Sequence, residues 1–282
     1  MPTIADILAA AGELKALPRA WQHIDAVLAR EAATSEQIAA AVAADPPLAA
    51  RVLKLANSPL YGFSRRVERL SQAVHMIGTR QLRELALAMA VVDLVQGCGA
   101  ARALVFSYLR RSLAVALTAR SLAQRRREAN VERLFVSGLL HDLGWFALFL
   151  ADAELAQRCL AQARSRGESV ERSEARELGF DHAAIGEALL QQWRLPQSLS
   201  EPVRWHHAPA LASSQRVECA LIHVAMVTCE LVGVIDALGL TTPLDGSAWD
   251  LLGLEPTACV DSVREAEDAL AAMIDIFVGA GE

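Results

Sequence analysis

The sequence predicts an all-α protein with two helical lobes. Apolar residues recur at spacings of three and four along almost every segment of the 282 residues, as they do on one face of a helix. No convincing run alternates apolar and polar positions in the way that predicts a strand. Ala, Leu, Glu, Gln and Arg dominate the composition, and all five are strong helix formers.

Capping residues and prolines mark the helices of the first hundred residues. Thr34 followed by Gln37 is a capping-box pattern, which opens a helix to about Ala44. Asp45 precedes two prolines and caps the next helix, which ends before Pro59 because the residue before proline leaves the α region. A loop over 60–63 and two more helices, 71–78 and 79–95, complete this half.

Gln96 to Gly99 is the flexible-looking joint of this half, so the sequence predicts a lobe boundary there. The helices expected after it run to Arg127, from about Val131, and over 151–165, 169–178, 182–193, 197–207, 215–237 and from Pro256 onward, with a loop at 241–246. The predicted divisions are an N-terminal helical lobe over 1–97, a second lobe over 98–210, and a helical extension over 211–282 packed on the second lobe.

Composition limits the classes of function. With 53% hydrophobic residues the chain can bury a large core. A net charge of −6 argues against a nucleic-acid surface, which needs a concentrated basic face. The five cysteines show no C-x-x-C spacing, which favours free thiols in a reducing cytoplasm over disulfides or a cysteine zinc site.

No membrane span or signal peptide is expected. The two longest apolar stretches, 134–150 and 219–235, are interrupted by His141 and Asp142 in the first and by His223 and Glu230 in the second. The N-terminus lacks a charged region followed by an apolar core. We therefore expect a soluble protein of the cytoplasm.

The residues with metal-ligand chemistry lie in the second half of the chain. They are His141-Asp142 in a Leu-Leu-His-Asp-Leu-Gly segment, then His182, then His206-His207. This series resembles the ligand set of the HD phosphohydrolases, which use one or two metal ions to activate water against phosphate esters.

The resemblance fails at both ends of the series. It implies an opening histidine where Arg111 stands and a closing aspartate where Met226 stands. A guanidinium cannot lose a proton to bind a metal, and a thioether is too soft for the hard cations of such sites. Trp145 also replaces a lysine common in active relatives, and Ala208-Pro209 departs from the HD-GYP motif. The sequence therefore predicts a hydrolase site that has lost its chemistry.

A second resemblance, to the HDOD family of bacterial signalling proteins, covers residues 14 to 210. It implies a catalytically silent HD-like lobe joined to a helical lobe and used for regulation. The motifs that carry it are Leu17-Pro18, Asp45-Pro46-Pro47-Leu48, Leu55-Ala56-Asn57-Ser58, Tyr61-Gly62, Ala73-Val74-His75-Met76-Ile77-Gly78, Ser137-Gly138-Leu139-Leu140-His141-Asp142-Leu143-Gly144, Gly179-Phe180-Asp181-His182 and Trp205-His206-His207.

Two interpretations of the ligand residues stay open. Asp142 with His182, His206 and His207 could hold a single metal ion. We favour the alternative, in which these groups bond one another and Arg111 pairs with Asp142 in place of the missing cation. No cofactor is then expected.

The function predicted is a non-enzymatic signalling module that contacts partner signalling proteins or a second copy of itself. One alternative is a metal-dependent phosphohydrolase acting through His141, Asp142 and the three later histidines. A second is a DNA-binding regulator, because 35–56 can be mistaken for a helix-turn-helix, although its second helix carries only Arg51 and Lys54 as bases.

Overall fold

The structure is a computed structural model and describes residues 1–30, 33–235 and 242–279. Within these ranges the chain forms helices and no strand, which confirms the all-α prediction. The helices are α1 (Ile4–Ala10), η1 (Gly12–Lys15), α2 (Arg19–Leu28), α3 (Ser35–Ala43), α4 (Pro46–Ala56), α5 (Leu70–Ile77), α6 (Thr79–Gly97), α7 (Arg102–Arg125), α8 (Val131–Leu140), α9 (Leu143–Ala151), α10 (Ala153–Arg166), α11 (Val170–Leu178), α12 (His182–Gln192), α13 (Gln197–Trp205), η2 (Pro209–Leu211), α14 (Arg216–Val232), α15 (Gly246–Leu252) and α16 (Pro256–Phe277), where η marks a 3-10 helix.

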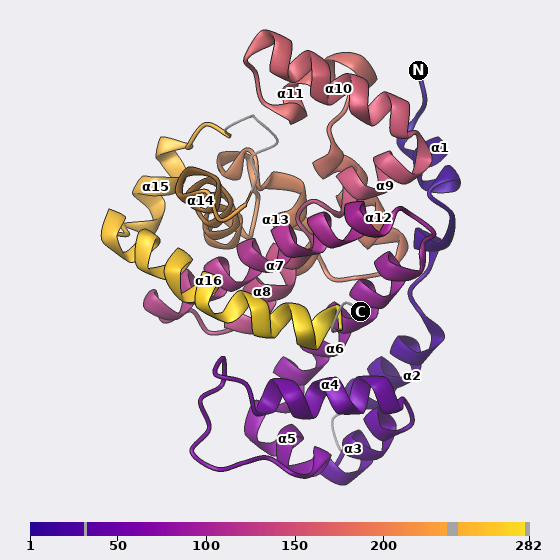
Figure 1. The fold of residues 1–282 in the computed structure, drawn as a ribbon, viewed down its shortest axis with the longest axis vertical. Coiled ribbons are helices and arrows are strands. Elements are labelled where there is room, and N and C mark those ends of the chain that lie inside the picture. Colours follow the sequence, from indigo (N-terminus) through magenta and orange to yellow (C-terminus); the bar gives the residue numbers. More distant parts are fainter. Residues whose placement is uncertain (31–32, 236–241, 280–282) are drawn as a thin grey trace.

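The helices gather into a smaller lobe of α2 to α5 and a larger lobe of α7 to α16, with α6 running between them (Figure 1). Helix α6 packs against α2 on one side and α8 on the other. Helix α1 precedes the smaller lobe in sequence but packs on α9 and α12 of the larger lobe. The first hundred residues therefore contribute to both lobes.

Local sequence sets the helix starts in the smaller lobe. Thr34 accepts a hydrogen bond from the backbone of Gln37, and the Gln37 side chain accepts one from the Thr34 backbone, so the predicted capping box is present. Asp45 caps α4 by accepting from the backbone N–H of Leu48. These two predictions are confirmed.

The larger lobe is built around α7, which is packed by α8, α14 and α16. Its residues from Ser112 to Ala123 are buried on every side, as expected for a central helix. Gly138 of α8 faces α7 so closely that a Cβ atom there would lie 2.7 Å from the Cα of Ala116. The glycine thus permits the close approach of the two helices.

One helix prediction is wrong. The single helix expected from about Val131 up to the next one at 151 would include His141 and Asp142, but α8 ends at Leu140 and α9 starts at Leu143. Adjacent residues inside one helix point in different directions. The break at the pair lets both side chains face the same place.

The chain from Val131 to Ala151 is long and apolar enough to cross a membrane by length and composition alone, with a mean hydropathy of 1.7. In this structure 78% of its most apolar window is buried inside the larger lobe. Such burial is typical of a core helix, and length and composition alone are weak evidence for a span.

The end of α14 also differs from expectation. The predicted helix reached about Ala237, which lies outside the described residues, but α14 already ends at Val232. Gly233 follows with a φ of 82°, the left-handed conformation that glycine adopts at helix ends. The predicted loop before α15 is present over 242–245, and its first residue lies outside the described ranges.

Candidate functional site

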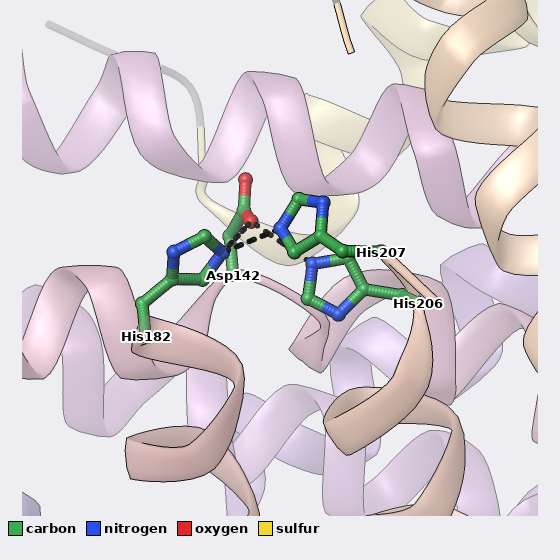
Figure 2. A group of neighbouring side chains, drawn as sticks. All are labelled: Asp142, His182, His206 and His207. Carbon is green, nitrogen blue, oxygen red and sulfur yellow. Dashed lines mark hydrogen bonds and ion pairs between the residues drawn. The ribbon is translucent and has the colours of Figure 1, made fainter. Parts of the chain in front are cut away.

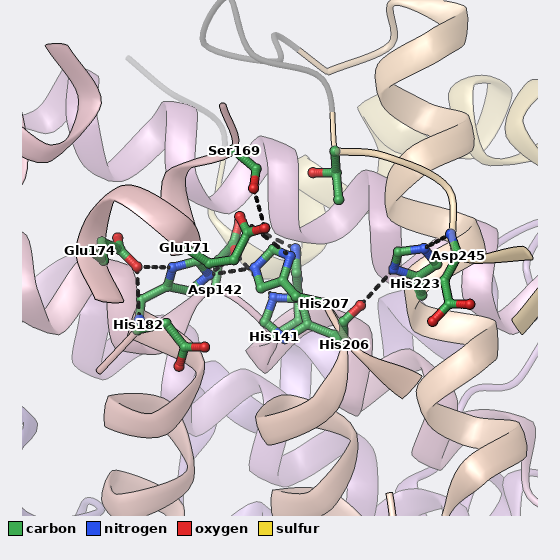
Figure 3. Close-up of polar contacts among 12 residues, drawn as sticks. His141, Asp142, Ser169, Glu171, Glu174, His182, His206, His207, His223 and Asp245 are labelled. Carbon is green, nitrogen blue, oxygen red and sulfur yellow. Dashed lines mark hydrogen bonds and ion pairs between the residues drawn. The ribbon is translucent and has the colours of Figure 1, made fainter. Parts of the chain in front are cut away.

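Five side chains meet in the larger lobe and form what we call the histidine cluster: His141, Asp142, His182, His206 and His207. They come from the break between α8 and α9, the start of α12 and the end of α13; Figure 2 draws four of them, and Figure 3 adds His141. In four of them, Asp142, His182, His206 and His207, one ligand atom each lies within 4.8 Å of the others. The fold therefore brings together the five residues that the sequence motifs singled out as candidate metal ligands.

Asp142 lies at the centre of the cluster. Its Oδ2 atom is 3.2 Å from Nε2 of His141, and its Oδ1 atom is 3.4 Å from Nε2 of His182 and 3.8 Å from Nε2 of His206. The Asp142 side chain is 11% exposed, and two of these histidines, His141 and His206, are fully buried. Three imidazole nitrogens thus point at one buried carboxylate.

Backbone carbonyls fix two of the rings. Nδ1 of His141 is 2.7 Å from the carbonyl oxygen of Gly138, and Nδ1 of His206 is 2.7 Å from that of Val203. Because a carbonyl can only accept, each Nδ1 carries the hydrogen in the neutral ring. The other ring nitrogen, Nε2, is buried in both residues and has no hydrogen-bond partner within the described part of the chain.

His182 is held by a carboxylate from α11. Its Nδ1 is 2.6 Å from Oε2 of Glu174, and its backbone N–H donates to the same oxygen at 2.8 Å (Figure 3). Burial alone would lower the pKa of His182, but Glu174 and Asp142 outweigh it and hold that pKa well above its usual value. The two carboxylates therefore favour the protonated form of His182.

The two last histidines of the cluster stay neutral. Burial lowers the pKa of His206 and of His207 well below the usual value, and the neighbouring imidazoles lower both further. Nε2 of His207 lies 2.9 Å from Nε2 of His182, so the imidazolium of His182 donates to it. His207 then carries its own hydrogen on Nδ1, which lies 3.9 Å from Glu171.

Arg111 supplies a permanent positive charge beside the cluster. Its Nε donates to Oδ2 of Asp142 at 2.9 Å, and its Nη2 donates to Oε1 of Glu230 at 2.9 Å. The predicted contact between Arg111 and Asp142 is present. Burial would raise the pKa of the Asp142 carboxyl, but His141 and Arg111 outweigh it and hold that pKa well below the usual range.

Glu230 is a site residue that sequence reasoning missed. Met226 is fully buried on α14 and contributes no atom to the four-residue ligand group, while Glu230 lies one helical turn further and reaches Arg111. A lone carboxylate in the apolar stretch 219–235 was the available signal, because such a charge is rarely buried without a partner.

Glu171 and Glu174 of α11 were also missed. Glu174 is fully buried and holds His182, whereas Glu171 accepts a hydrogen bond from Ser169 near His207 (Figure 3). The sequence carries no comparable signal for them, because glutamate in a short polar helix is ordinarily exposed.

Glycines set the spacing of the helices that carry the cluster. A Cβ atom on Gly144 of α9 would lie 1.9 Å from the carbonyl oxygen of His182 and 2.4 Å from the backbone nitrogen of Gly186. Backbone of α9 and α12 is thus in direct contact there, which places Asp142 beside His182.

His223 is a buried histidine of α14 whose two ring nitrogens both have hydrogen-bond partners. Its Nδ1 donates to the carbonyl oxygen of His206 at 2.8 Å, and its Nε2 accepts from the backbone of Asp245 at 2.9 Å (Figure 3). The imidazole therefore ties α14 and the start of α15 to the segment that carries the histidine pair.

The second helix of the apparent helix-turn-helix has little free charge. Arg51 of α4 donates to both carboxylate oxygens of Asp93, at 2.7 and 2.5 Å, and Nζ of Lys54 is 3.3 Å from Asp275 of α16. Helix α4 also packs against α5, α6 and α16. Both bases of the helix that would read DNA in that alternative are thus matched by carboxylates of the same chain.

An all-helical fold in which a His-Asp pair, a single histidine and a His-His pair converge defines a protein of the HD type. A family model described as the HDOD domain matches residues 14–209, well over half of the sequence. The chain belongs to the HDOD family. A protein of Treponema pallidum is 27% identical over 205 residues, a match that spans 72% of this chain and only 38% of that relative.

Solved structures show the same fold. A Geobacter sulfurreducens HDOD domain protein of unknown function has a TM-score of 0.69 at 26% identity, with 97% of this chain and 95% of that one covered. A Shewanella amazonensis protein provisionally named a phosphohydrolase has a TM-score of 0.64 at 25% identity, with 93% and 98% covered. A Marinobacter aquaeolei protein provisionally assigned to signal transduction has a TM-score of 0.71 at 22% identity, with 93% and 59% covered.

Proposed function

We propose that this chain is a non-enzymatic regulatory module of bacterial signal transduction that acts by protein–protein contact. The observation that carries the proposal is the Arg111 guanidinium, bonded to Asp142 and Glu230 where the resemblance to HD enzymes implies a histidine ligand. An arginine stays protonated and cannot bind a metal. A two-metal mechanism needs a complete set of ligands around its bridging water.

The partners are signalling proteins or a second copy of the chain, and we place the module in the cytoplasm. All five cysteines are free thiols, in keeping with a reducing compartment. Binding to nucleic acid is disfavoured, because Arg51 and Lys54 are matched by carboxylates of the chain.

Hydrolysis assays test the proposal. Purified protein supplied with manganese, iron or zinc is assayed on cyclic dinucleotides, nucleotides and p-nitrophenyl phosphate, next to a metal-free blank. We expect no turnover above the blank. Turnover that disappears in the His182→Ala/His206→Ala double variant would overturn the proposal.

A metal-dependent phosphohydrolase is the second candidate, favoured by one specific observation. The unpartnered Nε2 atoms of His141 and His206 face Asp142, and Nε2 of His182 faces Nε2 of His207. Lone pairs that converge in this way need a proton or a cation between them, and histidine with carboxylate suits several divalent ions. Asp142, His182, His206 and His207 would hold the ion.

Metal binding by an Arg111 variant distinguishes between these two candidate functions. Replacing it by histidine removes a fixed positive charge next to Asp142 and offers a neutral imidazole instead. We expect Arg111→His to retain zinc or manganese after gel filtration, and the unchanged protein to retain much less, by elemental analysis. Stoichiometric metal in the unchanged protein, lost in the His182→Ala/His206→Ala variant, would favour the hydrolase.

A further inference from the structure

A groove on the smaller lobe, far from the histidine cluster in the fold, has the properties of a docking site. It has a volume of about 1090 Å³ and lies between α4 and the loop that joins α4 to α5. In Figure 1 this loop forms the side edge of the smaller lobe. Its lining residues are Ala50, Leu53, Lys54, Ala56, Asn57, Ser58, Pro59, Gly62, Phe63, Arg65, Arg66, Val67 and Glu68.

The loop over 58–69 is clamped at its base. The Asn57 side chain behaves like a peptide group: its Nδ2 donates to the carbonyl oxygen of Val67 at 2.8 Å, and its Oδ1 accepts from the Val67 backbone at 2.8 Å. The same Nδ2 also donates to the carbonyl oxygen of Leu53. The backbone at Val67, where the loop returns, is thereby fixed to the end of α4, so this edge of the groove is formed in the absence of a ligand.

The middle of the loop is anchored to the larger lobe. The ring of Tyr61 stacks on Phe63 with centroids 5.5 Å apart, and the guanidinium of Arg120 lies 5.5 Å from the Tyr61 ring. Arg120 is itself buried and paired with Glu132 at 3.1 Å. The loop that forms one side of the groove is thus held in place at its base by Asn57 and at its middle by Tyr61.

The charge of the groove is opposite to that of the chain. Arg65 and Arg66 are exposed, and within the described residues neither forms an ion pair. Lys54 adds a third positive charge, partly matched by Asp275, while Glu68 supplies the one acidic group in the lining. A cationic rim stands out on a protein of net charge −6.

The floor of the groove is apolar. Its apolar lining comes from Ala50 and Leu53 of α4 and from Pro59 and Phe63 of the loop. Apolar floors with a charged rim take amphipathic peptide segments, whose apolar side chains fill the groove while their charged side chains meet the rim. Nucleic acid instead needs a broad basic face, which two free arginines do not provide.

We propose that this groove binds an acidic, apolar-containing peptide segment of a partner protein. The inference rests on the proposed function, because it names the surface through which the module contacts a partner. Arg65 and Arg66 bind the acidic side chains of the segment, and the apolar lining from α4 and Phe63 contacts its apolar side chains.

Peptide arrays test the groove with defined probes. The 282-residue protein is incubated with three sets of random-order peptides. The first set is made from Asp, Glu, Leu and Phe; in the second, Lys and Arg replace the acids, and in the third, Ser replaces the apolar residues. We expect binding to the first set only. Equal binding to the basic or the apolar-free peptides would overturn the proposal.

Two variants place the binding in the groove. Arg65→Glu/Arg66→Glu should weaken binding by at least about tenfold, because it reverses the charge of the rim. The matched control is Arg158→Glu/Arg166→Glu on the exposed face of α10, which makes the same change of net charge and should bind normally. Ala50→Trp, an exposed position on α4, should fill the floor and also abolish binding.

Unchanged binding in Arg65→Glu/Arg66→Glu or in Ala50→Trp would overturn the proposal. So would preferential binding of a single-stranded oligonucleotide, lost in the same arginine variant, which would assign the rim to nucleic acid. Turnover in the hydrolysis assays would overturn the proposed function whatever the arrays show. If no peptide binds and no turnover is measured, the proposed peptide site is wrong and the proposed function stands.

Discussion

At the scale of single residues, the charge of the site is set by Arg111. Its guanidinium lies between Asp142 and Glu230, and its side chain is only 18% exposed. Taking three charges out of water costs free energy, and their mutual attraction and hydrogen bonds offset that cost. Removing the guanidinium would leave the buried carboxylates of Asp142 and Glu230, whose side chains are 11% and 3% exposed, without this cationic partner.

Arg111→Ala should therefore lower the free energy of unfolding strongly. We expect a loss of about 3 kcal/mol, the lower end of the range for a broken buried pair, because Arg111 keeps some exposure. Urea denaturation measures the loss. The control is Arg83→Ala, which breaks an exposed pair with Asp25 and should cost at most about 1 kcal/mol. Equal losses in the two variants would contradict this account of Arg111.

The histidines predict how the stability of the metal-free protein depends on pH. His206 and His207 have lowered pKa values in the fold, so below about pH 6.5 the unfolded chain binds protons that the folded chain does not. Stability should fall as the pH drops below that value. The raised pKa of His182 acts in the other direction: its contribution is complete below about pH 6.5 and is lost as the pH rises through the folded pKa.

Thermal unfolding in the presence of a chelator should thus show a maximum near pH 6.5, the ordinary pKa of histidine. The variant His207→Gln removes one titrating group, and the acid side of its profile should be shallower. An identical acid limb in the variant would show that His207 does not hold a lowered pKa.

At the scale of secondary-structure elements, the contact between α9 and α12 positions the cluster. Gly144 has no side chain at the point where the two backbones meet. A Cβ atom there would lie only 1.9 Å from the carbonyl oxygen of His182. The clashing atoms belong to backbone, so no side chain can rotate away. The helices themselves would have to separate.

Gly144→Ala should consequently destabilise the fold by roughly 1–3 kcal/mol, as overpacking does, and should move Asp142 away from His182. Gly246→Ala is the matched control, since no atom lies within 4 Å of its Cβ position and its φ is not positive. Urea midpoints compare the two. Similar midpoints for Gly144→Ala and the unchanged protein would show that α9 and α12 move apart freely.

At the scale of the whole molecule, the 58–69 loop links the two lobes. Tyr61 rests on Arg120 of α7, the helix that also carries Arg111, so the smaller lobe touches the central helix of the larger one. The buried pair of Arg120 with Glu132 gives the ring a fixed partner. The relative position of the lobes thus depends in part on this aromatic contact.

Tyr61→Ala should release the loop from the larger lobe. We expect faster amide hydrogen exchange over 58–69, with a loss of about 1 kcal/mol for the contacts of the ring. Phe106→Ala, at an exposed position on α7, should leave the exchange of the loop unchanged. Equal protection of the loop in both variants would mean that Tyr61 does not anchor it.

The sequence by itself determined the helical class, many of the helix ends and the identity of the cluster residues. These features depend on neighbours a few positions away: Thr34 caps with Gln37, Asp45 caps with Leu48, and a pair such as His141-Asp142 is visible as a motif. Short-range physics of this kind can be read without knowing the fold. The contact of Arg111 with Asp142 was also predicted, because a buried carboxylate needs a cation.

Only the tertiary structure decided which carboxylates complete the site. Glu174 looks like an ordinary helical glutamate, and although Glu230 stands out in an apolar stretch, the sequence does not identify its partner. The partners Arg111 and His182 come from other helices. Long-range packing also decided the break after Leu140 and the backbone contact at Gly144. The physical reason is that the energy of a buried charge or of a close helix contact depends on what the fold places opposite it, and local sequence carries no record of that neighbour.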